Sequence, residues 1–359
     1  GIQAGLGGID RSTAAVIESS TAVGGTRPTV AYVGGTDGMM HAFCADGVGA
    51  CAGNVGNELW AFMPQTELDK IRLNTARIDG SPKVADVFGD FNGDGHNEYK
   101  TVLTFQTGNL GSAATYALDI TDPTDPQILW ENPTTGGGTT LAMASILVPG
   151  EGLTHVTYSH SRTVGSAGME VIATRTQDGT VLWNWTTPYE AVRATATGAI
   201  PEDGFPGGVS AFSAANDGLV DTILVPTLWG SVYSLSASGD TSVPGDPKFN
   251  NGGAPIFVFD RGPGAGQAED YHPIGASVSI YSSKSTGTLH AVAVTGGFTI
   301  HPETGMSAAS WSPSDENQYA IGFPVDPGAE IDEDNAQIDF TIDFGQGNRA
   351  FSQAVIAGD

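Results

Sequence analysis

The sequence has few positively charged residues. Its 359 residues include 14 Lys and Arg against 40 Asp and Glu, which gives a formal net charge of −26. Contacts to phosphate groups need clustered Lys and Arg, so this composition argues against nucleic acid and anionic membrane surfaces as partners. Two explanations of the acidity stay open. One is general solubility, and the other is cation binding by the few carboxylates that cluster in the sequence.

Long apolar runs are missing as well. No run approaches the roughly 18 residues that a membrane-spanning helix needs, so we expect no membrane insertion. The sequence shows no signal peptide and does not begin with Met. A mature or excised segment of a longer product fits this better than a complete translation product.

Cysteine is also scarce, with only Cys44 and Cys51 in the whole chain. They flank a short, Gly-containing, loop-like segment, and a disulfide closing this loop would indicate an oxidising compartment and a secreted protein. The alternative is two free thiols. Zinc is disfavoured, because the chain has no other Cys and no His pair at ligand spacing.

Helical periodicity is nearly absent, and the one candidate is a short helix at Gln65–Leu73. The 50 Gly and 20 Pro punctuate short apolar runs rich in Val, Ile, Thr, Tyr and Phe, which is typical of many strands and tight turns. One pattern recurs: a strand, a Gly turn, an aromatic strand, a polar loop and a strand, which carries Trp in the first three copies. The copies span residues 30–62, 101–130, 155–183, 222–259 and, more weakly, 289–321.

Repeats spaced about 50 to 70 residues apart predict an all-β fold, a β-propeller of four-stranded blades. We expect an entry strand and linker at 1–27 and the propeller at 28–359. A β-sandwich, or a pair of them, is the alternative.

The strongest candidate site is the acidic loop within the predicted hairpin at 84–105. Calcium prefers six to eight oxygen ligands on a flexible loop, and Gly95 permits the sharp turn that lets them converge. The predicted calcium ligands are the side chains of Asp90, Asn92, Asp94 and Glu98 and the backbone carbonyl of His96. An EF-hand would place its Glu where Thr101 stands and would have flanking helices, whereas strands are predicted here. The loop therefore resembles the hairpin calcium loops of integrin-type propellers. An Asx-rich turn without metal is the alternative.

Two further acidic segments are weaker candidates. The loop at 213–221 has the same frame, with Asp217 and Asp221 as possible ligands. Ser213 and Ala215 occupy the first two ligand positions, however, so an ordinary turn is favoured. The cluster at 330–335 is interpreted as solvated charge on a loop.

Catalytic patterns are missing from the sequence. The seven His residues are scattered, without an H-E-x-x-H pair, and there is no G-x-S-x-G elbow or Lys-containing phosphate loop. His41 and His290 lie in strand patterns and are expected to be packed or hydrogen-bonded. We therefore predict a protein that is not an enzyme.

Several strings resemble the PilY-type proteins, which are large secreted factors at the tips of type IV pili. Residues 32–43 and 118–123 are the most specific. The supporting strings are 58–64, 79–84, 116–117, 229–233, 272–274 and 318–321.

This resemblance implies a C-terminal β-propeller of seven blades, a role in pilus assembly and retraction control, surface adhesion, and minor pilins as partners. Two alternatives remain open: a quinone-dependent oxidoreductase propeller and an integrin-like adhesive propeller unrelated to pili. The first is weakened because Cys44 and Cys51 are not adjacent, as they typically are in that family.

The propeller is expected to be incomplete in this chain. Residues 350–359 stop just after a predicted strand, at a Gly-Asp turn where a hairpin partner would follow. Such an end would leave an unpaired sheet edge, which proteins normally cover. We expect a partner chain or further residues to pair with it.

Overall fold

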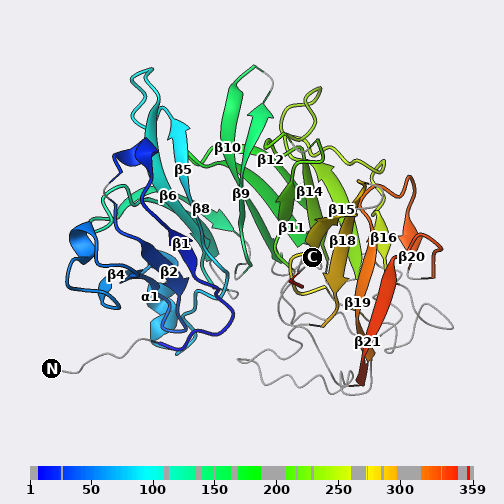
Figure 1. Ribbon diagram of the computed structural model, residues 1–359, viewed down its shortest axis with the longest axis horizontal. Helices are drawn as coiled ribbons and strands as arrows, with labels where there is room; N and C mark the ends of the chain where they lie inside the picture. Colours follow the sequence, from blue (N-terminus) through cyan, green and yellow to red (C-terminus); the bar gives the residue numbers. More distant parts are fainter. Residues whose placement is uncertain are drawn as a thin grey trace. The chain divides into compact units, whose positions relative to one another are not determined.

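A computed structural model confirms that the protein is all-β (Figure 1). It describes residues 7–25, 27–108, 113–134, 137, 139–148, 150–162, 169–186, 207–215, 217–227, 230–259, 272, 274–283, 287–296, 317–332, 334–346 and 354–355. Over these ranges the strands form five sheets, four of four strands and one of five. Repeated, mostly four-stranded antiparallel sheets are the blades of a β-propeller, so the predicted fold class is confirmed.

The first two sheets are simple meanders in which each strand pairs with the next along the chain. The first contains β1 (Ala15–Ile17), β2 (Val30–Gly34), β3 (Met40–Cys44) and β4 (Glu58–Phe62). The second contains β5 (Lys83–Gly89), β6 (Glu98–Gln106), β7 (Ala113–Asp119) and β8 (Gln127–Thr134). Between them lies helix α1 (Gln65–Ile71), which confirms the predicted short helix, and two short 3-10 turns are η1 (Thr21–Val23) and η2 (Gly49–Cys51).

The remaining sheets continue the same plan, with one exception. The third contains β9 (Ala142–Val148), β10 (Gly152–Arg162), β11 (Met169–Arg175) and β12 (Val181–Thr186). The fourth contains β13 (Ser210–Phe212), β14 (Thr222–Pro226), β15 (Ser231–Ser236), β16 (Phe257–Val258) and β20 (Ile331–Asp332). The fifth contains β17 (Ser279–Ser282), β18 (Leu289–Val294), β19 (Asn317–Pro324) and β21 (Phe340–Gln346). The exception is β20, which leaves the order of the chain to pair in parallel with β16.

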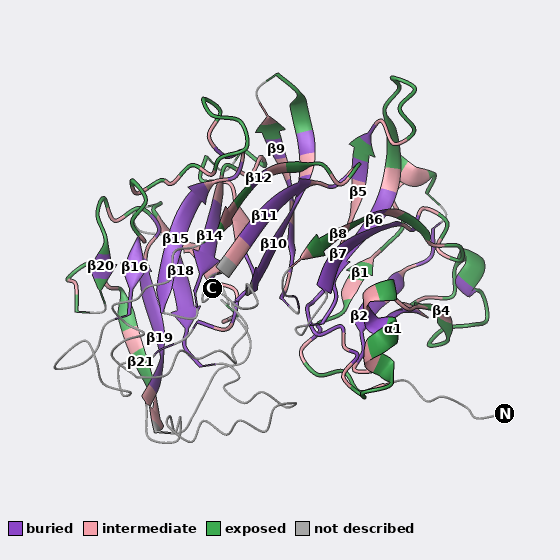
Figure 2. Cartoon of the chain, turned by 180° about the vertical axis from the view of Figure 1, so that it is seen from behind, coloured by how far each residue is buried: buried purple, intermediate pink, exposed green. Residues whose placement is uncertain are grey.

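The chain divides into two compact units, residues 1–164 with 172–182, and residues 165–171 with 183–359. In the first unit, apolar side chains of the first two sheets form one cluster that includes the stacked rings of Phe105 and Tyr116, 5.4 Å apart. In the second unit, the cluster centres on Phe257 and Phe323, whose stacked rings lie 4.5 Å apart. Figure 2 shows burial following the strands, as expected when side chains pack between sheets.

The last strand of each of the first three sheets carries a tryptophan whose indole donates a hydrogen bond to a backbone carbonyl outside its own sheet. Trp60 donates to Pro123 (2.9 Å), Trp130 to Thr176 (2.8 Å) and Trp183 to Ala237 (3.2 Å). Within the first unit these bonds join the first sheet to the second and the second to the turn between β11 and β12.

Glycine is required beside two of these indoles. Gly179 has φ 78°, and a Cβ there would lie 2.7 Å from Cγ of Trp130. Gly239 has φ 73°, and its Cβ would lie 2.5 Å from Cδ1 of Trp183. Both the left-handed backbone and the close approach of the ring exclude a side chain.

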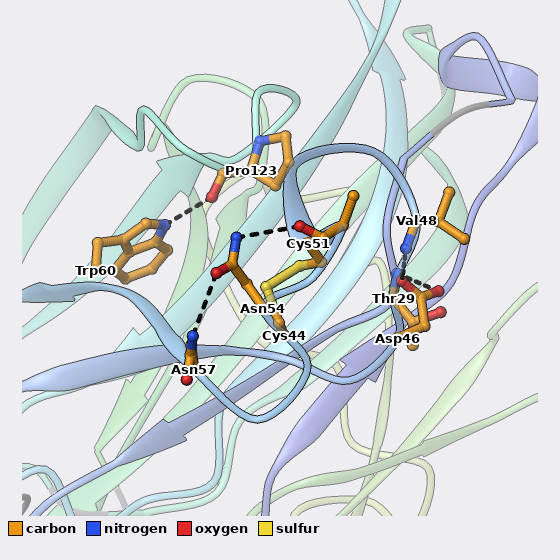
Figure 3. The surroundings of a disulfide bond; sticks show 10 residues. Thr29, Cys44, Asp46, Val48, Cys51, Asn54, Asn57, Trp60 and Pro123 are labelled. Carbon is orange, nitrogen blue, oxygen red and sulfur yellow. Dashed lines mark hydrogen bonds between the residues drawn. A yellow bond between two sulfur atoms is a disulfide. The ribbon is translucent and has the colours of Figure 1, made fainter.

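The predicted disulfide between Cys44 and Cys51 is present, with Cα atoms 5.5 Å apart (Figure 3). The carboxylate of Asp46 orders the loop it closes by accepting backbone N–H bonds from Thr29 (2.9 Å) and Val48 (3.0 Å). Both sulfur-bearing residues are buried in the cluster between the first two sheets, so the bridge ties the loop to the core.

The structure tests the two expectations about the ends of the chain only in part. Strand β1 lies within the segment expected to be an entry strand and linker, and it pairs with β2. The predicted last strand lies outside the described residues except for positions 354 and 355. None of the described helices is long and apolar enough to cross a membrane.

Candidate metal site

The acidic loop at 90–97 connects β5 to β6, as the sequence predicts. The two strands pair without a bulge up to the loop, where Phe88 faces Tyr99 and Gly89 faces Glu98. The rings of Phe88 and Tyr99 contact each other, with centroids 4.7 Å apart, and both are exposed. Strands on both sides confirm that the loop is not an EF-hand.

Asp90 organises the loop through its carboxylate. One oxygen accepts the backbone N–H groups of Gly93 (2.8 Å) and Asp94 (3.2 Å), and the other accepts that of Gly95 (2.8 Å). Gly93 and Gly95 have φ values of 74° and 84°, which turn the backbone around the side chain. The hydrogen bond from Gly95, followed by those from the other amides, lowers the pKa of Asp90 below its usual value.

Asn92 and Asp94 lie in the same turn. The Asn92 side-chain oxygen accepts the N–H of Asp94 (3.0 Å), and its amide nitrogen donates to the Asp94 carboxylate (3.1 Å). The other Asp94 oxygen accepts the N–H of His96 (2.8 Å). The structure therefore brings together three of the predicted ligands within one turn and places the fourth side chain, that of Glu98, at the first position of β6.

Glu98 has a cationic neighbour that the sequence analysis overlooked. Its carboxylate lies 3.9 Å from Nζ of Lys100, which contacts Asp119 more closely at 2.8 Å. The same ammonium lies 5.4 Å from the centroid of the Phe91 ring. One positive charge therefore already stands beside the loop.

The residues of the loop fit a hard cation. The donors are four oxygen-bearing side chains and a backbone carbonyl, without sulfur, and three of the side chains are acids. A carboxylate oxygen that accepts one N–H keeps a second lone pair, so the observed bonds leave acceptor capacity. Across the part of the chain that the structure describes, no three His, Cys, Asp or Glu residues are grouped tightly enough to hold a metal by themselves. The same hydrogen bonds would also hold an Asx-rich turn, and calcium stays a prediction.

The second acidic loop uses its carboxylates differently. Asp217 exchanges hydrogen bonds with Ser213 (3.0 and 3.1 Å) and accepts the N–H of Leu219 (2.9 Å). Asp221 accepts the N–H groups of Ala214 (3.0 Å) and Ala215 (3.2 Å). Both carboxylates are therefore engaged by groups of the same loop, as in an ordinary turn.

The third acidic segment lies partly in a strand. Asp332 belongs to β20 and accepts the N–H of Asp334 (3.2 Å), and both residues are exposed. Glu333 lies outside the described residues. Exposure of the described acids agrees with solvated charge.

Gln177 is a neighbour of the first loop that sequence reasoning missed. It lies in the turn between β11 and β12, and its side-chain amide donates to the backbone carbonyl of Asp90. The preceding residue, Thr176, accepts the indole hydrogen bond of Trp130. This one turn therefore contacts both the candidate metal loop and the indole. No local pattern could have indicated it, because the contact spans 87 residues of sequence.

Both histidines expected to be hydrogen-bonded are so. His41 is buried, with its ring nitrogens 2.6 Å from Glu58 and 3.2 Å from Asp37. His290 lies 2.6 Å from the carboxylate of Asp339, and its other nitrogen lies 2.8 Å from the hydroxyl of Thr288.

Comparison with known proteins yields no matching family model. Over 118 residues, 30% of the chain, the sequence is 40% identical to the type IV pilus biogenesis factor PilY1 of Pseudomonas aeruginosa, and this stretch covers 9% of that protein. Over 228 residues, 59% of the chain, it is 27% identical to a PilY1 homolog of Xylella fastidiosa, covering 16% of that protein. The chain thus spans a small part of the length of these curated relatives.

The crystal structure of the Pseudomonas aeruginosa PilY1 C-terminal domain has a similar fold. It superposes with a TM-score of 0.60 over 86% of this chain and 60% of that domain, at 19% sequence identity. At this level of identity the likeness concerns the fold alone.

Proposed function

We propose, on the premise that this chain is homologous to the type IV pilus biogenesis factor PilY1, that it is a propeller module of a pilus-tip factor. The observation that carries the proposal is the 40% identity over 118 residues, supported by the fold shared with the PilY1 C-terminal domain. In this role the module is secreted, binds minor pilins at the tip, and supports pilus assembly, retraction control and adhesion to surfaces. Its role is binding rather than catalysis.

The loop at 90–98 binds calcium in this proposal. Asp90, Asn92, Asp94 and Glu98 supply side-chain oxygens and His96 its carbonyl. Three acids in so short a segment repel one another, and a divalent cation removes that repulsion. Support comes from the oxygen-only donor set and from the amides that already hold Asp90 in place. The bound ion would fix the connection between β5 and β6.

Adhesion is assigned to the same hairpin. Phe88 is 40% and Tyr99 is 47% exposed, and they stand next to the loop as a cross-strand pair. Aromatic side chains combine a large contact area with little conformational freedom, which suits a binding surface. Calcium would hold this pair in a fixed position.

The test is made in the organism that carries the chain. We expect deletion of the gene to reduce surface pili and the purified chain to retain minor pilins on an affinity column. Normal piliation together with no retention of minor pilins would refute the pilus role. Asp94→Ala should weaken adhesion without abolishing retention of the pilins, and Asp217→Ala is the matched control in the second acidic loop.

A further inference from the structure

Lys83, the first residue of β5, has an unusual environment. It is partly buried, and within the described ranges of the chain its ammonium has neither a hydrogen bond nor an ion pair. Burial lowers the pKa of Lys83, and no nearby carboxylate offsets this effect. In a chain with 40 acidic residues, a withdrawn cation without a counter-ion is unexpected.

The register of the second sheet places three more polar side chains on the same face as Lys83. Lys83 pairs with Thr104 across β5 and β6, and Gln106 pairs with Thr115 across β6 and β7. Thr104 and Gln106 are two residues apart on one strand, so they point to the same face. All three are almost fully buried, at 0%, 1% and 2% exposure for Thr104, Gln106 and Thr115.

Each of these side chains has a polar atom that finds no hydrogen-bond partner among the residues that the structure describes. The atoms are Oγ1 of Thr104, Nε2 of Gln106 and Oγ1 of Thr115. A buried polar atom left unpaired costs free energy, and such atoms are rare in folded proteins. Three of them on one face of a sheet therefore call for an explanation.

The orientation of Gln106 is fixed by its other end. Its side-chain oxygen accepts hydrogen bonds from the hydroxyl (2.8 Å) and the backbone N–H (3.2 Å) of Thr139. The amide nitrogen is therefore the end left over, and it can only donate. The Lys83 ammonium also only donates, whereas the hydroxyl groups of Thr104 and Thr115 can donate or accept. The group therefore contains one positive charge and an excess of donors.

We propose that this face of the second sheet binds a small monovalent carboxylate, held by Lys83, Gln106, Thr104 and Thr115. A cation is excluded because the lysine and the amide nitrogen only donate. An anion is favoured over water alone because none of the described carboxylates compensates the lysine charge. Asp119, which pairs with Val102 on this face, is engaged by Lys100 at 2.8 Å.

Size and charge both point to a small carboxylate. Thr104 lies directly across from Lys83 and Gln106 lies diagonally from it, and such neighbours have Cβ atoms about 5 and 7 Å apart, a span that one carboxylate group can bridge. Thr115 pairs with Gln106 one strand further from Lys83. A carboxylate offers about four acceptor positions, enough for several of these donors. A single ammonium matches one negative charge. Larger ligands are disfavoured because Val102 and Ala117, buried on the same face, lie next to the donors.

The experiment uses the full chain and acetate as the probe. Binding is measured by the line width of ¹³C-labelled acetate and by the melting temperature, with acetate compared with chloride at equal ionic strength. We expect saturable acetate binding and a rise in melting temperature that chloride does not produce. Lys83→Met should weaken acetate binding about tenfold or more, because it removes a charge-assisted hydrogen bond. Lys248→Met, a change at an exposed lysine, is the matched control and should leave binding unchanged.

A second variant covers the case in which Lys83→Met does not fold. Thr104→Val keeps the shape and the lysine but removes one donor, and it should weaken acetate binding severalfold. If acetate and chloride act alike, or if Thr104→Val and the wild type bind acetate equally, the site holds only water and the proposal is overturned. Calcium and a chelator are tested in parallel, so that this outcome is independent of the loop at 90–98.

Discussion

Gly179→Ala should destabilise the protein by about 3 kcal/mol. Two costs add at this position. An L-residue at φ 78° costs roughly 1 kcal/mol relative to Gly. The new Cβ would lie 2.7 Å from Cγ of Trp130, so the rigid indole must move, and overpacking of this kind costs about 1–3 kcal/mol. Movement of the ring also strains its hydrogen bond to Thr176.

The matched control is Gly150→Ala. Gly150 has φ 87°, and a Cβ there would have nothing within 4 Å. This variant carries the backbone cost without the clash and should lose only about 1 kcal/mol. The assay is the free energy of unfolding from urea titrations of both variants and the wild type. Equal losses in the two variants would show that the indole does not depend on Gly179, and the reasoning would be refuted.

Three further predictions concern the loop, an ion pair and the disulfide. Chelation of calcium should lower the melting temperature, because calcium at a hundredfold excess over its dissociation constant stabilises the folded state by roughly 2.7 kcal/mol. Asp94→Ala should remove most of the difference between calcium and chelator, and Asp217→Ala should remove little of it. Burial alone would raise the pKa of Asp86, but hydrogen bonds from Arg27 and Thr101 outweigh burial and lower this pKa. The ion pair of Asp86 with Arg27 therefore stabilises the fold above about pH 4, and this contribution is lost as the pH falls through the lowered pKa. Asp86→Asn should therefore flatten the acid limb of a stability-versus-pH curve, and an unchanged limb would contradict the assignment. Alkylation without reductant should leave the mass of the chain unchanged, and Cys51→Ala should cost on the order of 2–3 kcal/mol of unfolding free energy, whereas two alkylated thiols would contradict the bond.

The local elements of the fold could be predicted from the sequence. The strands expected at 222–225, 231–235 and 289–294 lie within β14, β15 and β18, because alternating apolar residues and Gly turns act over a few residues. The short helix and the hairpin around the acidic loop follow for the same reason. The parallel pairing of β20 with β16 was not predicted, since β20 has only two residues and its partner lies 74 positions away, as the pairing of Phe257 with Ile331 shows.

The candidate site was only partly predictable. Spacing identifies Asp90, Asn92 and Asp94, because side chains two residues apart in a Gly-containing turn must meet. It does not identify Gln177 or Lys100, whose positions depend on how sheets and strands pack. The sequence shows the Trp-bearing strands as a repeat, but the carbonyl that each indole reaches belongs to another part of the chain. The position of Lys83 beside buried polar side chains is likewise invisible without the register of β5 and β6.

The turn at 176–180 has a mechanical consequence. Gln177 binds the backbone of the candidate loop, while Thr176 accepts the indole of Trp130 and Gly179 packs on its ring. A pulling force applied to the tip of the β5–β6 hairpin is therefore transmitted both along the two strands and through the contacts of this turn. Because the contacts of this turn end on Trp130 in β8, the hairpin cannot peel away without also loading the last strand of its own sheet. In the pilus-tip role proposed above, this arrangement would spread tension over several strands of the sheet instead of concentrating it on one loop.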